Sequence, residues 1–62
     1  MKAKQIIDDF QDKIKSQDII IVTECILNNY LSDIFMKDLE TEEDLFELNK
    51  AEDWLRHYYN LD

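Results

Sequence analysis

The residues that most often carry out covalent chemistry are scarce in this chain. It has one cysteine, Cys25, and one histidine, His57, and neither glycine nor proline among its 62 residues. A nucleophile needs a base within hydrogen-bond reach, a zinc site needs several Cys or His ligands, and a phosphate-binding loop needs glycines. We therefore expect Cys25 to be a small core residue and His57 a surface residue. The sequence predicts that the chain is not an enzyme and holds no metal or cofactor.

Carboxylates are abundant, but their spacing does not suit catalysis. The pairs Asp8-Asp9 and Glu42-Glu43 are adjacent in sequence, and adjacent residues on a helix point apart. They therefore cannot flank one bond as the two acids of a glycosidase do. The spaced acids and central glycine of a calcium-binding loop are also missing from the sequence. The carboxylates indicate a charged surface rather than a catalytic pair.

The densest acidic stretch covers residues 38–47, which hold six acids and no base. One interpretation is a well-capped helix start with a solvated face. The other is a negative docking surface for a basic patch on a partner protein, in one form a mimic of nucleic acid. Phe46 lies within this stretch, and Trp54 lies eight residues after Phe46. An exposed aromatic residue beside a charged rim is typical of a binding hot spot. The predicted partner-binding residues are Asp38, Glu40, Glu42, Glu43, Asp44, Phe46, Glu47 and Trp54.

The negative charge is concentrated in the second half of the chain. Fifteen Asp and Glu against seven Lys and Arg give a net charge of −8, of which residues 1–31 carry −1 and residues 32–62 carry −7. Affinity for nucleic acid comes largely from Lys and Arg. Two helices at 18–28 and 33–40 would suit a helix-turn-helix, but the second holds three acids and one base. We therefore expect no direct nucleic-acid binding.

The chain is expected to be a single cytoplasmic domain, residues 1–62. Its longest apolar run, residues 19–22, is far shorter than the ~18 residues that span a membrane. The lysines near Met1 are followed by acids where a signal peptide needs an apolar segment. Usage rich in Ile, Asn, Lys, Asp and Tyr indicates an AT-rich genome and fits an accessory protein of a bacterium or phage.

The hydrophobic pattern predicts an amphipathic helix over 3–15 and a second helix over 18–30. The run 19–22 is β-branched and could also be read as a strand, but no other apolar run offers it a partner. As a helix, 18–30 would be apolar on nearly all sides and hence buried. The pair Asn28-Asn29 is the expected end of this helix, because Asn tolerates the left-handed conformation.

Two further helices are predicted at 33–40 and 42–59. Ser32 is the expected cap of the first, although 18–30 and 33–40 could instead form one bent helix. Thr41 with Asp44 resembles a capping box at the start of the last helix. The apolar stripe expected to face the core along the last helix consists of Leu45, Leu48, Ala51, Leu55, Tyr58 and Tyr59.

The sequence therefore predicts an all-α bundle of three to four helices with two alternative functions. The favoured one is a small acidic adaptor or inhibitor that binds a basic surface on a partner protein. The alternative is a structural homodimer in which the buried helix 18–30 packs across a two-fold axis and completes the bundle. The residues assigned to self-association are Ile20, Ile21 and Leu27, since leaving such side chains in water is unfavourable by roughly 1.5–3 kcal/mol each.

Overall fold

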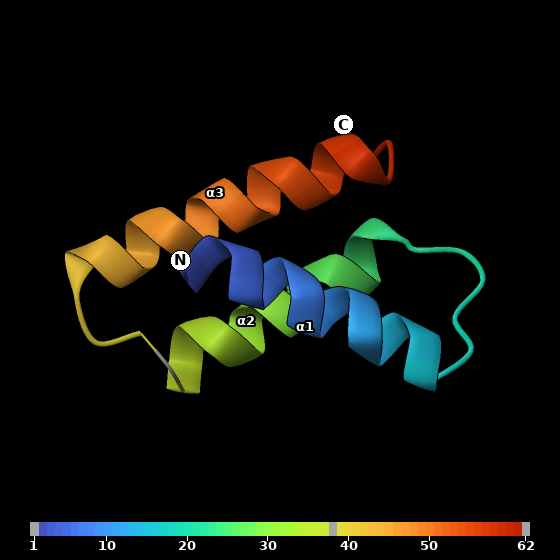
Figure 1. Ribbon diagram of the computed structural model, residues 1–62, viewed down its shortest axis with the longest axis horizontal. Helices are drawn as coiled ribbons and strands as arrows, with labels where there is room; N and C mark the ends of the chain where they lie inside the picture. Colours follow the sequence, from blue (N-terminus) through green and yellow to red (C-terminus); the bar gives the residue numbers. More distant parts are fainter. Residues whose placement is uncertain (1, 38, 62) are drawn as a thin grey trace.

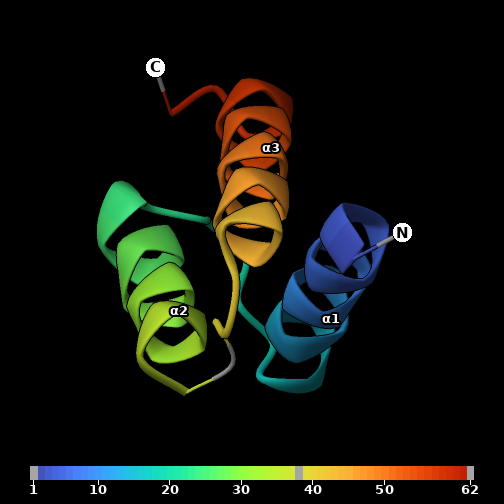
Figure 2. The same cartoon turned by 90° about the vertical axis from the view of Figure 1, so that its left-hand side faces the viewer.

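The computed structural model describes residues 2–37 and 39–61, and the described chain folds into three helices with no strand (Figure 1). Helix α1 spans Lys2–Ser16, α2 spans Glu24–Lys37 and α3 spans Glu42–Tyr58. The predicted all-α class is confirmed. Viewed end-on, the helices occupy the corners of a triangle with α3 at its apex (Figure 2). Both α1 and α2 pack against α3, whereas they contact each other only weakly.

The core forms where the three apolar stripes meet. Phe10, Leu27 and Leu55, one from each helix, are the largest side chains that are fully buried. Ala51 is fully buried as well, and its small side chain allows the neighbouring helices to approach α3 closely. The remaining buried residues are Ala3, Ile6, Leu31 and Leu48.

The helix predicted over 18–30 is wrong in its first half, because residues 18–23 are not helical. Helix α1 ends with Asp18 in the left-handed conformation (φ 54°), where the Ile19 N–H donates to the Ile14 carbonyl at 3.0 Å and the Asp18 N–H donates to the Lys15 carbonyl at 3.3 Å. This pair of bonds is the Schellman motif that terminates helices. The β-branched residues that follow are weak helix formers, and the chain stays irregular until Thr23.

Helix α2 therefore begins later than expected and continues further. The Thr23 hydroxyl oxygen accepts a hydrogen bond from the Ile26 N–H at 3.3 Å, as an N-cap residue does. The expected break at Asn28-Asn29 and the expected cap at Ser32 are both wrong, because all three residues lie inside α2. The alternative of one continuous helix is correct for 24–37, although the helix does not extend back to residue 18.

The Asn28 side chain belongs to a polar cluster that ties α2 to α3. The guanidinium of Arg56 donates to Glu24 at 2.9 Å, to Glu52 at 3.0 Å and to the Asn28 side-chain oxygen at 3.3 Å. One cation on α3 thus holds the first two turns of α2. The position of Asn28 in the middle of a helix is explained by this contact.

The start of α3 is as predicted. The Thr41 hydroxyl oxygen accepts from the Asp44 N–H at 3.2 Å, and the Asp44 carboxylate accepts from the N–H of Glu40 at 3.3 Å. The helix ends in a second Schellman motif with Asn60 at φ 57°, closed by bonds from the Leu61 N–H to the Arg56 carbonyl and from the Asn60 N–H to the His57 carbonyl. Asp18 and Asn60 thus occupy the positions that glycine takes in other chains.

Three assignments of core residues are wrong. Leu45, expected in the core stripe of α3, is 40% exposed. Cys25 is exposed, because it lies two residues before the fully buried Leu27 and so on the opposite side of α2. Tyr58, expected in the core stripe of α3, is also exposed and stacks on Trp54. Tyr59 packs against the core in its place.

Packing of α2 through Leu27 predicts a large effect of its truncation. Leu27→Ala should lower the free energy of unfolding by about 2–5 kcal/mol, because its fully buried side chain would leave a cavity. The control Met36→Ala, at an exposed position of the same helix, should change it by less than about 0.5 kcal/mol. Urea denaturation followed by circular dichroism measures both, and equal effects would contradict the packing of α2.

Candidate functional site

An apolar groove runs between α1 and α3 and has a volume of about 460 Å³. Helix α3 contributes Lys50 and Trp54 to its walls. Helix α1 contributes Ala3, Lys4, Ile7, Asp8 and Gln11. Because Ala3 is small and Ile7 is half-buried, the floor of the groove is apolar while the lysines stand at its edges. Grooves of this kind, apolar with a few polar groups at the rim, are typical binding sites.

Three exposed aromatic side chains follow one another along α3, and we call them the aromatic stripe: Phe46, Trp54 and Tyr58. Of the three, Trp54 lines the groove. The three residues are spaced by eight and four residues, which places them on one side of the helix. The exposed fractions of Phe46, Trp54 and Tyr58 are 62%, 45% and 58%. The rings of Trp54 and Tyr58 are stacked, with centroids 4.9 Å apart and an interplanar angle of 12°.

Lys50 lies between Phe46 and Trp54 along α3, four residues from each, and lines the groove together with Trp54. Its ammonium lies 5.6 Å from the centre of the Phe46 ring and 3.6 Å from the carboxylate of Glu47. A cation over an aromatic face is attracted by the ring quadrupole, so Lys50 limits the positions that Phe46 can take. Phe46 and Trp54, which sequence analysis singled out separately, therefore belong to one continuous surface.

The acidic stretch is divided between structural and solvent-facing carboxylates. Asp44 accepts from the ammonium of Lys2 at 3.2 Å, which fixes the start of α1 to the first turn of α3. Glu47 is engaged by Lys50. Glu40 is exposed beside a different hollow, between α1 and α2, and the predicted site residue Asp38 lies outside the described residues.

Unpaired negative charge remains on the outer side of α3. Glu42, Glu43 and Asp53 are exposed, and none of them takes part in an ion pair within the described part of the chain. Glu42 and Glu43 lie in the first turn, where the helix dipole favours anions. These three residues, rather than the whole stretch 38–47, form a negative border beside the aromatic stripe.

The residues assigned to self-association do not share one surface. Leu27 is fully buried in the core of its own chain and cannot reach a second copy while the fold is intact. Ile20 and Ile21 are 94% and 73% exposed in the irregular segment between α1 and α2. The two isoleucines are therefore available for an interface, and Leu27 is not.

Sequence reasoning missed several residues of the groove. Tyr58 was assigned to the core, although its spacing of four from Trp54 is the signal that would place the two rings together. Ile7, Lys4 and Gln11 come from the first helix, and no pattern within α3 points to them. Only the packing of α1 on α3 brings them beside Trp54.

The described residues offer little support for other kinds of site. The Cys25 thiol accepts a hydrogen bond from the Asn29 amide at 3.8 Å, and His57 is exposed. No group of three or more His, Cys, Asp or Glu side chains in the described ranges is arranged to hold a metal ion. None of the three helices described is both long and apolar enough to cross a membrane.

Comparisons of this chain with protein-family models, with curated proteins and with solved structures find no match. Its function is therefore inferred from the groove, the aromatic stripe and the charges beside them.

The bond between Lys2 and Asp44 predicts a loss of stability in acid. The hydrogen bond from Lys2, followed by that from the backbone of Glu40, lowers the pKa of Asp44 below its ordinary value of 3.8. Since the pKa is lower in the folded state, the stabilisation is complete above pH 3.8 and is lost as the pH falls through the folded-state value. Asp44→Asn should make the melting temperature fall less steeply below this pH. The same slope in wild type and variant would contradict this role.

Proposed function

We propose that this chain is a small protein-binding protein, an adaptor or inhibitor, that docks the exposed side of α3 on a basic surface of a partner protein. The observation that carries the proposal is the aromatic stripe, which leaves three large rings in contact with water beside an apolar groove. Soluble monomers rarely expose a contiguous apolar patch unless it is used for binding. Tyr and Trp are also among the residues that dominate binding energies.

The partner's basic character is inferred from the charges around the aromatic stripe. Glu42, Glu43 and Asp53 surround Phe46 on the outer side of α3, and residues 32–62 carry a net charge of −7. Complementary charge accelerates encounter and disfavours acidic competitors. One class of partner with such a surface is a nucleic-acid-binding protein, whose site the helical carboxylates would occupy in place of phosphates.

The proposal assigns no catalytic step to the chain. A reactive cysteine needs a base within hydrogen-bond reach, and the hydrogen bond described for the Cys25 thiol comes from Asn29 rather than from His57. Blocking a site or connecting two surfaces requires only a folded surface of defined shape. A chain of 62 residues can provide that.

Removal of the aromatic anchors should abolish partner binding. Phe46→Ala combined with Trp54→Ala should weaken binding by at least about 2 kcal/mol, or roughly 30-fold, as expected for hot-spot residues. Proteins retained by the immobilised chain from a bacterial extract would be identified by mass spectrometry, and the best-retained one titrated against each variant. Phe35→Ala, which truncates an exposed aromatic residue of α2, is the matched control. Equal retention by the double variant and the control would contradict the proposal.

Neutralising the border of the aromatic stripe should slow association. Glu42→Gln, Glu43→Gln and Asp53→Asn together should lower the association rate by about tenfold or more at low salt and flatten its dependence on ionic strength. The residues Asp44 and Glu47 are left intact because they form ion pairs within the fold. Stopped-flow or surface plasmon resonance at two salt concentrations measures the effect. An unchanged rate would show that charge steering is not involved.

A further inference from the structure

The face between α1 and α2 is the most open part of the fold. The two helices pack on α3 but hardly on each other, and two hollows of about 530 and 260 Å³ follow the gap between them. Tyr30 lines both hollows and spans the gap, where its hydroxyl donates to the Ile6 carbonyl at 3.2 Å. The face therefore carries two hollows with Tyr30 between them, packed on the Phe10 ring at 5.0 Å.

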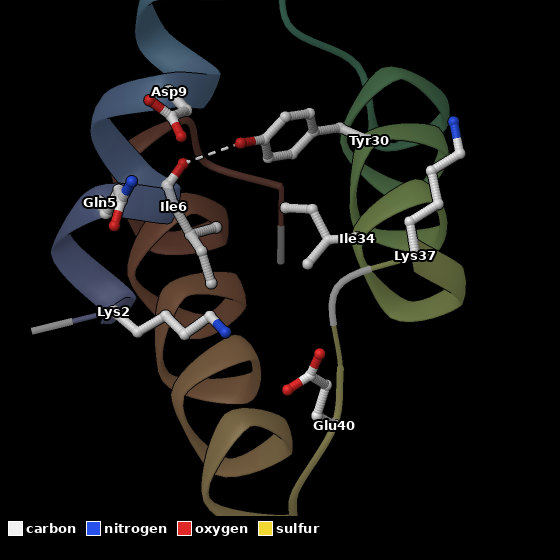
Figure 3. Close-up of a pocket in the computed structure, with 8 residues that line it drawn as sticks. All are labelled: Lys2, Gln5, Ile6, Asp9, Tyr30, Ile34, Lys37 and Glu40. Atoms are coloured by element: carbon white, nitrogen blue, oxygen red, sulfur yellow. Dashed lines mark hydrogen bonds between the residues drawn. The ribbon is translucent and has the colours of Figure 1, made fainter.

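The larger hollow lies at the end of the gap where α1 begins and α2 ends. Figure 3 shows Ile6 and Ile34 directed into the space between the helices, with Lys2 and Glu40 at its lower end. Its volume of about 530 Å³ is large enough to accept two branched aliphatic side chains. No described side chain of the same copy fills it.

The opposite end of the gap carries the most exposed aliphatic side chains of the loop. Residues 17–23 connect α1 to α2 there, and Ile19 lines the smaller hollow. The next two residues, Ile20 and Ile21, are 94% and 73% exposed. Apolar protrusions thus stand at one end of the face, and at the other lies a recess of mixed lining. Its apolar part consists of Ile6, Ile34 and Tyr30, and its polar part of Lys2, Gln5, Asp9, Lys37 and Glu40.

The charges along this face are balanced, in contrast to the rest of the chain. Three cations and three anions line the two hollows: Lys2, Lys13, Lys37, Asp9, Asp33 and Glu40. Helix α3 carries six acids and two bases, and the whole chain carries −8. Two copies therefore repel each other least when they meet through the face between α1 and α2, with both α3 helices outside.

We propose that this face binds a second copy of the chain about a two-fold axis perpendicular to the gap. Such an axis exchanges the two ends of the face, so Ile20 and Ile21 of each copy enter the 530 Å³ hollow of the other. The inference does not depend on the proposed function, because the aromatic stripe and its border remain outside the dimer.

The size of the face is consistent with this occupant. The chain extends 33 Å along its longest axis and 20 Å along its shortest, and α1 and α2 lie side by side across the latter (Figures 1 and 2). These extents give a footprint of about 660 Å², which is below the ~800 Å² per partner of a standard interface and within the range of small specific ones. The accessible surface of 4705 Å² also exceeds the roughly 4,250 Å² expected of a compact monomer of 7.5 kDa.

Sedimentation equilibrium tests the dimer. At concentrations up to about 0.5 mM the wild type should sediment as twice 7.5 kDa, and salt should strengthen the association because it screens the repulsion between like-charged copies. Ile20→Lys with Ile21→Lys should weaken it by at least about 100-fold, although these changes reduce the net negative charge. Phe46→Lys, on the outer side of α3, is the control and should still dimerise. A monomeric wild type, or a loop variant that dimerises normally, would overturn the proposal.

Disulfide trapping tests the orientation of the copies. In a Cys25→Ser background, an Ile20→Cys chain mixed with a Lys37→Cys chain should form a mixed disulfide under mild oxidation, since Lys37 lines the recess that receives the loop. Replacing the second chain by a Phe46→Cys chain should reduce the yield at least about tenfold. Equal yields with both chains would exclude the two-fold arrangement.

Discussion

Burial of a single stripe of α3 holds the three helices together. Leu48, Ala51 and Leu55 are buried in the core, and both other helices pack against α3. In contrast, α1 and α2 meet mainly through Tyr30, which contacts Phe10 and Ile6. A chain of this size buries only about 60% of the surface that its unfolded form exposes. One shared helix therefore supplies most of the stability, and each of the other two helices keeps a side that is not covered. The groove on one side of α1 and the hollows on the other are a direct result of this arrangement.

The same arrangement determines which carboxylates form ion pairs within the fold and which remain exposed to solvent. Asp44 and Glu47 are used within the fold, since they hold Lys2 and Lys50 near the start of α3. Arg56 secures the other end of α3 to α2. The carboxylates of α3 that remain in water, Glu42, Glu43 and Asp53, lie on the side of this helix away from the core. The negative surface and the exposed rings thus coincide because both lie outside the three-helix core.

Sequence analysis predicted the fold class, α1 and α3 to within two residues, and the cap at Thr41. These features depend on local spacing and on a short capping pattern, which the chain displays clearly. The start of α2 was mispredicted because Ile19 to Val22 are apolar enough for a buried helix, and the pattern does not show that Asp18 takes the left-handed conformation. The exposure expected for Phe46 and Trp54 is observed, while their role in binding stays a prediction. The contribution of α1 to the groove was not predictable, since it depends on tertiary packing.

The two helix ends at Asp18 and Asn60 bear on how the chain could evolve. The left-handed conformation is unfavourable by roughly 1–2 kcal/mol for a residue with a β-carbon. This free-energy penalty is smaller for Asp and Asn, the residues found at 18 and 60, but is not abolished. Glycine at either position would remove that penalty in the native state, although it would also loosen the unfolded chain. The absence of glycine at both ends indicates that selection has not driven this fold toward maximal stability, as is usual for natural proteins. Substitution by glycine at Asp18 or Asn60 is thus one way in which the chain could compensate for destabilising substitutions elsewhere on its surface.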